Sequence, residues 1–518
     1  MMAAEKKYLC GIDVGTTGTK TIIFDLEGNV AGKGYREYAC TYPRPGWVEQ
    51  DMDHVYAEAM ASCREAVTQA AVPPEEIAAV ALSTQRTTAV FLDGQEKILK
   101  AISWQDTRTV AELEDLEKYI GEKEFYELTG LPFNTTWIIT RILWMKKNEP
   151  STWEQVKKIA QVQDYFLRNM GAEGYFIDYP DACLYGLFDH KAYKWDDRLL
   201  NIAGIEEKLL PNPTPCGTAV GRLSKEAAAL TGLAEGTSIC VGAGDQNSAS
   251  IGAGIVDKGT VSVSLGTGGM AIACLDYPYR DPLSSACVTC HAITGHYQFE
   301  GYQLGAASIF RWFRDELAEY EKNHAKEEGI RVYDFLNREI EQVPVGAKGL
   351  VLMPYFASSG APRWDSNARG AILGLTLAHD RPCIARACME GIALEQKDIL
   401  TNMQENAITI DSVRIIGGAT NSNVWNQIQA DMYKLPCDTL AVEDAAVLGA
   451  AIMAGKAVGI FADIPEGVRK MVHVKEHYEP IRAHAEIYDK MYDIYCSAYE
   501  GLAGSHVYEK LAELQNMY

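Results

Sequence analysis

The stretch that decides the fold lies near the start of the chain, where residues 8–25 read YLCGIDVGTTGTKTIIFD. Two apolar runs flank a turn rich in glycine and threonine, a pattern that predicts strand, tight turn and strand. Asp13 closes the first run, so its carboxylate is expected at a strand end beside backbone N–H and hydroxyl donors. Such a turn can cradle a phosphate. A second turn at residues 26–29 then predicts a third strand.

A similar unit recurs about half a chain later, where residues 259–273 read GTVSVSLGTGGMAIA. The repeated turn suggests two halves of related architecture, each bringing one phosphate-facing loop to a shared cleft. Between the turns, helical spacing over Val55–Ala71 and Val110–Leu128 alternates with strands such as Ile77–Leu82. The class is therefore mixed α/β. The small residues 248–254 predict a linking helix at a lobe boundary just after Asn247.

Bulk composition agrees with two domains, because 518 residues with 47% hydrophobic content exceed what one core usually fills. The formal charge of -22 argues against nucleic acid and anionic membrane surfaces as partners. The start of the chain lacks the long apolar core of a signal peptide, and no later run approaches spanning length, so a soluble cytoplasmic protein is expected. Thirteen scattered cysteines, Cys287 and Cys290 included, are interpreted as reduced structural thiols.

The first turn carries the residue types that phosphate binding needs. Thr16 and Thr17 can donate hydroxyls to phosphoryl oxygens, and Lys20 can add positive charge from the next strand. Asp13 could hold Mg²⁺ directly or through water. The alternative is an ordinary hairpin whose Asp and Thr side chains satisfy turn donors.

A carboxylate near the acceptor is the second requirement, because removing the hydroxyl proton raises nucleophilicity as the new P–O bond forms. Asp245 is the candidate, since it follows the strand at residues 238–242 and stands beside Gly244 and Gln246. Gln246 can hydrogen-bond the ligand. The alternative for Asp245 is a helix cap.

Ligand-reading side chains follow other strands. Gln85 and Arg86 can read vicinal hydroxyls, while the Trp104 indole can pack on the C–H face of a sugar or polyol. A structural Arg–Asp pair with a core tryptophan is the alternative. Near the other end, the strand at 413–416 enters Gly417–Ala419 before a predicted helix at 424–432, and adenine or ribose could lie on that turn.

Together the segments 11–20, 244–246, 264–268 and 417–419 resemble the FGGY carbohydrate kinases nearly end to end. The resemblance implies an α/β fold with two actin-like (ribonuclease H-like) ATPase lobes and an inter-lobe cleft. Residues 1–248 would form the acceptor-binding lobe and 249–518 the lobe that binds Mg-ATP. It implies Asp245 as catalytic base and Asp13 as metal ligand. Carried over by position, the nucleotide side comprises Thr16, Thr17, Lys20, Gly266, Thr267, Gly268, Gly418 and Ala419.

The resemblance points to more than one acceptor. Gln85–Arg86 and Trp104–Asp106 resemble glycerol kinase, but Thr87 stands where that family has Glu, and its acceptor-contacting Tyr is replaced near Thr135–Thr136. Residues 178–183 and 362–365 look closer to xylulose kinase, and residues 24–29 and 311–315 are similar to autoinducer-2 kinases.

A ketopentose such as xylulose is therefore the expected acceptor, with glycerol, another polyol or the autoinducer-2 precursor as alternatives. An actin-like ATPase without a small acceptor is the alternative of another class. It would not need the acceptor-side residues Gln85, Arg86 and Trp104. Related kinases form dimers or tetramers, and a homodimer is the assembly that the resemblance allows.

Overall fold

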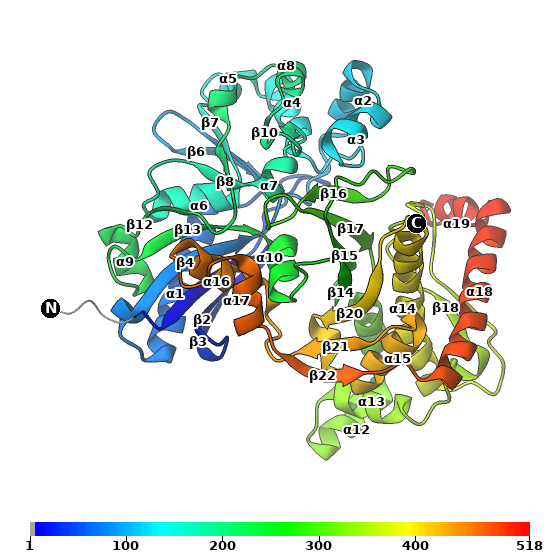
Figure 1. Cartoon of the computed structure of the whole chain (residues 1–518). Coiled ribbons are helices and arrows are strands. Elements are labelled where there is room, and N and C mark those ends of the chain that lie inside the picture. The colour runs from blue at the N-terminus through cyan, green and yellow to red at the C-terminus, as the bar shows by residue number, and fades with distance from the viewer. Residues whose placement is uncertain (1–5, 518) are drawn as a thin grey trace. The chain divides into compact units, whose positions relative to one another are not determined.

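The computed structural model describes residues 6–517, which fold into two compact units (Figure 1). Unit 1 holds the chain up to Val256 together with 274–299 and 444–473. Unit 2 holds 257–273, 300–443 and the chain from Val474 onward. The predicted α/β class with two lobes is confirmed. The units interleave along the chain, whereas the expected lobes 1–248 and 249–518 are consecutive segments, so the lobe bounds stay a prediction.

A mixed sheet forms the centre of unit 1, with strand order β12-β13-β4-β1-β2-β3. β1 pairs antiparallel with β2 and parallel with β4, which pairs parallel with β13. The predicted hairpin, the third strand and the strands near residues 77 and 238 are confirmed. The strands are β1 (Tyr8–Val14), β2 (Gly18–Asp25), β3 (Val30–Glu37), β4 (Ile77–Thr84), β12 (Ala219–Arg222) and β13 (Ser238–Gly244).

Both faces of this sheet are covered by helices, and β1 shows why. Cys10, Ile12 and Val14 alternate onto one face, where they join the core formed with α1 (Met52–Ala70) and α6 (Val162–Met170). Gly11 faces the other way, toward α16 (Ala445–Ala457), and an added Cβ would lie 2.2 Å from the Val447 carbonyl oxygen. The backbone of β1 therefore packs closely against α16 on the face of the sheet that also carries Asp13.

The helix predicted to link the lobes is α10 (Asp245–Gly252), and it differs from the expectation in place. It begins at Asp245, lies in unit 1 and packs against α16. The pairing is tight, since a Cβ on Gly252 would lie 1.8 Å from the Ala445 carbonyl oxygen. Its small residues allow this close packing of α10 against α16.

The helical stretch predicted over Val110–Leu128 is helical in the structure, but it is divided into two helices. α2 (Val110–Tyr119) ends where Ile120 is extended, and α3 (Glu122–Thr129) starts after Gly121, its N-cap. Glycine is a weak helix former and is tolerated at N-caps, so the apolar spacing alone missed the break.

A small sheet of order β6-β5-β7 and several short elements complete unit 1. They are η1 (Pro74–Glu76), β5 (Ala89–Leu92), β6 (Ile98–Ile102), α4 (Ile138–Asn148), α5 (Pro150–Trp153), β7 (Lys158–Ala160), β8 (Phe176–Asp178), α7 (Tyr179–Cys183), β9 (Phe188–Asp189), β10 (Lys194–Trp195), α8 (Asp197–Ala203), η2 (Glu207–Leu209), β11 (Asn212–Thr214), α9 (Lys225–Thr231), β16 (Cys287–Cys290) and α17 (Ile464–Met471).

Unit 2 has its own sheet, which contains the second predicted hairpin. β14 (Gly259–Leu265) pairs antiparallel with β15 (Gly269–Leu275) and parallel with β20 (Ile410–Ile416). β21 (Cys437–Leu440) pairs parallel with β20 and antiparallel with β22 (Val474–Tyr478). The hairpin and the strand before Gly417 are confirmed.

Helices surround this sheet, and α15 (Asn423–Tyr433) confirms the helix predicted at 424–432. Its N-cap Ser422 accepts a hydrogen bond from the Trp425 backbone N–H. The remaining elements are β17 (Tyr297–Gln303), which begins in unit 1, α11 (Ala307–Trp312), η3 (Phe313–Leu317), α12 (Glu319–Glu328), α13 (Val332–Ile340), η4 (Ala347–Gly349), β18 (Val351–Met353), β19 (Ala371–Leu373), α14 (Arg381–Glu405), η5 (Gly418–Asn421), α18 (Arg482–Gly504) and α19 (Val507–Gln515). Among residues 6–517, no helix has the length and apolar character needed to cross a membrane.

Gly242→Ala should destabilise the fold by more than about 2 kcal/mol. A Cβ there would lie 1.7 Å from the Leu82 carbonyl oxygen of β4, so β13 and β4 would have to separate. Urea unfolding followed by circular dichroism measures the change. Gly501→Ala in α18, where no atom lies within 4 Å of an added Cβ, is the matched control and should be neutral or stabilise by up to about 1 kcal/mol. An unchanged urea midpoint for Gly242→Ala would contradict the tight packing.

Candidate active site

The register of four strands brings the predicted residues of unit 1 into one row. Lys20 on β2 lies opposite Asp13 on β1, and Asp13 lies opposite Ser83 on β4. Ser83 in turn lies opposite Ala243 on β13, two residues before Asp245. Sheet pairing therefore places side by side residues that the chain separates by more than two hundred positions.

Asp13 is partly buried, and its carboxylate is the acceptor of one short hydrogen bond. Ser83 Oγ donates to Asp13 Oδ1 at 2.6 Å. Burial raises the pKa of Asp13 to about 7. The hydrogen bond from Ser83 opposes this rise. The nearby charge of Asp245 adds to the rise, and the charge of Lys20 opposes it. Asp13 therefore titrates near neutral pH.

Lys20 forms an ion pair with Asp444, a residue that sequence reasoning missed. Asp444 directly precedes α16, and its other oxygen lies 3.6 Å from Lys33 Nζ. No local sequence pattern predicts this ion pair, because the partners lie on segments far apart in sequence. The predicted phosphate-binding lysine is thus held in place by a carboxylate of unit 1.

Asp245 is the first residue of α10, and the cap position belongs to Gly244. The capping alternative is therefore not what the structure shows. Asp245 Oδ1 accepts a hydrogen bond from the Gln246 backbone N–H at 2.7 Å and lies 3.2 Å from Arg86 Nε. The predicted base and the predicted acceptor-reading arginine are in contact.

Asp181 lies behind this pair and was not among the predicted site residues. A Cβ on Gly244 would lie 2.3 Å from Asp181 Oδ1 and 2.6 Å from Arg86 Cδ, so Gly244 leaves room for both. Asp181 is fully buried, and within residues 6–517 neither carboxylate oxygen has a hydrogen-bond partner. Burial, with the charge of Asp178, raises the pKa of Asp181 well above its usual range. The signal that marks Asp181 is a buried carboxyl without a hydrogen-bond donor next to two predicted site residues. This signal is visible only in the structure.

Trp104, which is predicted to bind the acceptor, contacts Thr16, which is predicted to bind phosphate. Trp104 is 36% exposed, and its Nε1 donates to Thr16 Oγ1 at 2.8 Å. Thr17 next to it is exposed. Gln85 is buried and donates from Nε2 to Gln50 Oε1 at 2.9 Å, so it is less accessible to a ligand than its sequence position suggested.

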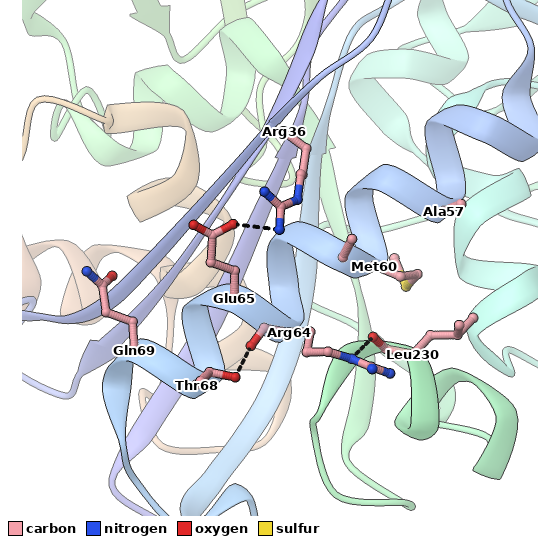
Figure 2. A pocket seen from close by; sticks show the side chains of 9 residues that line it. Arg36, Ala57, Met60, Arg64, Glu65, Thr68, Gln69 and Leu230 are labelled. Atoms are coloured by element: carbon pink, nitrogen blue, oxygen red, sulfur yellow. Dashed lines mark hydrogen bonds and ion pairs between the residues drawn. The ribbon is translucent and has the colours of Figure 1, made fainter.

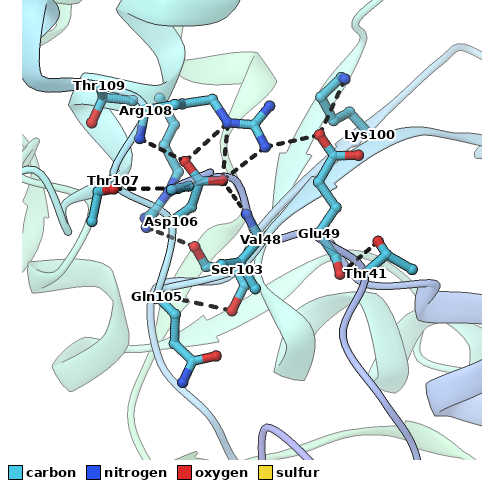
Figure 3. A network of polar contacts seen from close by, with 12 residues as sticks. Thr41, Val48, Glu49, Lys100, Ser103, Gln105, Asp106, Thr107, Arg108 and Thr109 are labelled. Atoms are coloured by element: carbon cyan, nitrogen blue, oxygen red, sulfur yellow. Dashed lines mark hydrogen bonds and ion pairs between the residues drawn. The ribbon is translucent and has the colours of Figure 1, made fainter. Parts of the chain in front are cut away.

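The structural alternative holds for Asp106, which Figure 3 shows within a buried network. Arg108 Nη2 donates to Asp106 Oδ2 at 2.7 Å and lies 2.8 Å from Glu49 Oε1. Asp106 Oδ2 also accepts from the Val48 backbone N–H at 2.6 Å. The Arg108 guanidinium lies 3.8 Å from the centre of the Trp47 ring. This network braces the loop that carries Trp104.

In unit 2 the predicted loop between β14 and β15 is held by backbone bonds. Gly266 N–H donates to the Gly268 carbonyl at 2.9 Å, and Ala306 N–H donates to the Thr267 carbonyl at 3.0 Å. Thr267 itself is exposed. An exposed threonine on a braced turn suits a phosphate contact.

The second predicted nucleotide turn of unit 2 follows β20. Gly417 has a φ of 89°, a left-handed conformation that favours glycine. No atom lies within 4 Å of an added Cβ on Gly418, whereas Ala419 is buried. The backbone at Gly418 is therefore open to a ligand.

A surface groove on α1 does not coincide with this site. Figure 2 shows its lining, which includes Arg36, Glu65, Arg64 and Leu230 and none of the predicted site residues. Arg36 pairs with Glu65 at 3.1 Å, and Arg64 Nε donates to the Leu230 carbonyl at 2.9 Å. Its charged groups are already bound to neighbours.

Two α/β units, each with a glycine-threonine hairpin, and a carboxylate next to an arginine are typical of one class of proteins, the actin-like small-molecule kinases. The chain belongs to the FGGY family of carbohydrate kinases: residues 8–252 match the family's N-terminal domain and residues 261–458 its C-terminal domain. Kinases of this family use ATP as phosphoryl donor, so the protein is an ATP-dependent phosphotransferase with an alcohol group as acceptor.

Named relatives differ in substrate. A gluconokinase of Bacillus licheniformis is 27% identical over 98% of this chain and 98% of its own length. A glycerol kinase of Limosilactobacillus reuteri (strain DSM 20016) is 30% identical, with 92% and 94% covered. The solved structure of a ligand-bound xylulose kinase from Lactobacillus acidophilus superposes with a TM-score of 0.88 at 26% identity, covering 98% of this chain and all of that one.

Asp13→Asn should be more stable than wild type at pH 8 in metal-free buffer, by about 2–4 kcal/mol. Because the folded pKa of about 7 lies above the unfolded value of 3.8, the carboxyl favours folding most below about pH 4 and loses that contribution as pH rises through 7. Urea unfolding from pH 4 to pH 8 measures the growing difference. Ser83→Ala removes the bond that opposes the shift, so it should move the pH window upward. A difference that is constant with pH would contradict the assignment.

Proposed function

We propose that this carbohydrate kinase transfers the γ-phosphoryl group of ATP to a hydroxyl of an uncharged linear sugar or polyol, most directly a ketopentose such as xylulose. The observation that carries the proposal is the charge around Arg86. The base candidate Asp245 already pairs with Arg86, and the buried carboxyl of Asp181 lies against Arg86 and Gly244.

The pairing of Arg86 with Asp245 selects against an anionic acceptor. Asp245 contributes to the raised pKa values of both Asp13 and Asp181, so the three carboxyls interact electrostatically. A substrate carboxylate would have to share Arg86 with the carboxylate of Asp245, and burying a carboxylate without a cation of its own is costly. Gluconate, suggested by the gluconokinase relative, is therefore the disfavoured acceptor, although it belongs among the compounds tested.

Glycerol is disfavoured for a different reason. The resemblance to glycerol kinases leads one to expect a glutamate at the position of Thr87 and a tyrosine near Thr135–Thr136, two groups that grip a three-carbon polyol. A longer linear acceptor can compensate through additional hydroxyls that Arg86 and Gln246 read.

The chemistry assigns roles to the residues of unit 1. Asp245 takes the proton of the acceptor hydroxyl as its oxygen bonds to the γ-phosphorus, and the bond from that phosphorus to the β,γ-bridging oxygen breaks to release ADP. Arg86 orients Asp245 and the acceptor. Acceptor-side residues are Gln85, Arg86, Trp104, Asp245 and Gln246.

The proposed nucleotide-contacting residues come from the first hairpin turn of unit 1 and, separately, from two turns of unit 2, with residues 1–248 as acceptor lobe and 249–518 as nucleotide lobe. Lys20, already beside a carboxylate, and the hydroxyls of the first turn would contact phosphoryl oxygens. The nucleoside would lie on the open backbone of the turn after β20. This set is Thr16, Thr17, Lys20, Gly266, Thr267, Gly268, Gly418 and Ala419.

Mg²⁺ is the expected partner of the phosphates, and the donor chemistry of unit 1 fits it. Mg²⁺ is usually held by one or two carboxylates, water and substrate phosphates, not by an all-protein cage. Asp13 offers such a carboxylate, and residues 6–517 contain no group of three or more His, Cys, Asp or Glu suited to a metal. Bound there, the ion would neutralise charge on the transferring phosphoryl group.

An acceptor panel tests the proposal directly. ADP release with Mg-ATP is measured for D-xylulose, D-ribulose, glycerol, erythritol, gluconate and the autoinducer-2 precursor. A ketopentose should give the highest kcat/KM, and gluconate should be poor because its carboxylate would have to compete with Asp245 for Arg86. Preference for gluconate or glycerol would overturn the ketopentose proposal. ADP release that no acceptor stimulates would point to an ATPase of the actin-like class.

Asp245→Asn should lower kcat about 10²–10⁴-fold, because the amide cannot accept the hydroxyl proton. The acceptor KM should change only a few-fold, since Asn keeps the shape of the side chain. Asp197→Asn is a matched control, because Asp197 is likewise the first residue of a helix, α8, but is exposed and outside the site. Near-normal turnover of a correctly folded Asp245→Asn protein would refute its role as base.

A further inference from the structure

Three loops on the acceptor side of unit 1 meet at one buried side chain. The acceptor loops are residues 85–87, 103–106 and 134–136, and the sequence singled out each of them. Arg141 lies on α4 and is fully buried. We propose that Arg141 is a positioning residue that sets the geometry of all three acceptor loops and thereby the affinity for the sugar; the inference rests on the proposed function of unit 1.

The guanidinium donates to one backbone carbonyl of each acceptor loop. Arg141 Nη1 donates to the Thr87 carbonyl at 2.7 Å and to the Thr136 carbonyl at 2.5 Å. Arg141 Nη2 donates to the Ser103 carbonyl at 2.9 Å. The planar fork of arginine can span three acceptors in fixed directions, whereas one ammonium group is a point donor on a flexible stem.

Two of these three carbonyls adjoin a residue assigned to the acceptor. Thr87 directly follows Arg86, and Ser103 directly precedes Trp104. A shift of either carbonyl therefore moves the side chain that reads the sugar. Small misplacements of ligand-positioning groups have large effects on rate.

Thr87 shows why the backbone of the first loop needs hydrogen bonds that fix its conformation. Its φ of 56° is left-handed, a conformation that β-branched residues rarely adopt. Both of its backbone polar groups are bound from outside the loop: Thr87 N–H donates to Gln161 Oε1 at 2.7 Å, and its carbonyl accepts from Arg141. Without these bonds the backbone would relax, and the neighbouring contact of Arg86 with Asp245 at 3.2 Å would change.

The third loop is tied to α4 by hydroxyls as well. Thr140 Oγ1 donates to the Thr135 carbonyl at 2.9 Å, and Thr109 Oγ1 donates to the same carbonyl at 3.2 Å. Thr109 belongs to the segment that follows the second loop. The loops are thus connected to one another through α4, with Arg141 at the shared point.

Arg141 keeps its positive charge despite complete burial. Burial lowers its pKa to about 10, the charge of Asp106 supports the cation, and Arg108 opposes it. Asp106 is the carboxylate at the centre of the network in Figure 3. The cation is therefore present at every pH at which the kinase would be assayed.

The test compares Arg141→Lys with wild type in the full chain, using D-xylulose and ATP. Lysine keeps the charge, but its single nitrogen cannot replace both Nη1 and Nη2, so kcat/KM for D-xylulose should fall about 10- to 100-fold, mainly through a higher KM. The KM for ATP should stay within about twofold. Arg386→Lys is the matched control, because Arg386 is also a buried arginine that donates to two backbone carbonyls, those of Ile340 and Val343, but in unit 2. It should leave the D-xylulose KM within about twofold.

Backbone hydrogen exchange supplies a readout that needs no acceptor. Arg141→Lys should speed exchange in the three acceptor loops, and Arg386→Lys should not. Equal increases in both KM values, or unchanged exchange in the loops, would overturn the positioning role. If wild type does not phosphorylate D-xylulose, the ketopentose proposal fails, and the exchange experiment still decides the role of Arg141.

Discussion

The site of unit 1 depends on the register of four neighbouring strands, β2, β1, β4 and β13. Pairing places Lys20, Asp13 and Ser83 in one row with Ala243, so that Asp245 follows at the same edge. Glycine makes this arrangement possible where backbones approach too closely for a side chain, as Gly242 does against Leu82. A slip of one residue would turn the row of polar groups to the opposite face of the sheet.

Charge is concentrated at this edge and only partly compensated. Lys20 pairs with Asp444 and Arg86 with Asp245, while Asp13 is buried enough for its pKa to reach about 7 and Asp181 has no hydrogen-bond donor within the described chain. A family that transfers phosphoryl groups needs positive charge near phosphate and a carboxylate near the alcohol. Because Arg86 is already compensated by Asp245, a charged acceptor would be buried without a partner, and this is the physical basis for proposing an uncharged acceptor.

Buried arginines fix the geometry of the loops, as strand register fixes the geometry of the sheet. Loops lack a ladder of backbone bonds, so their geometry must come from side chains that reach their carbonyls or pack beneath them. Arg141 donates to three loops, and Arg108 braces the loop of Trp104 through Asp106 while lying on Trp47. These two arginines link the α4 region to the edge of the sheet where Asp245 begins α10.

The sequence by itself determined the α/β class, both hairpins, the strands before Ser83 and Asp245, and the family, because alternating apolar residues and glycine turns are local signals. It also singled out Asp13, Arg86 and Asp245, which the structure brings into electrostatic or direct contact. Only the tertiary structure decided the break at Gly121, the pairing of Lys20 with Asp444, the place of Asp181 behind Gly244 and the three carbonyls bound by Arg141. Long-range partners leave no mark on local spacing, since they are selected by the packing of segments that meet only after the chain has folded.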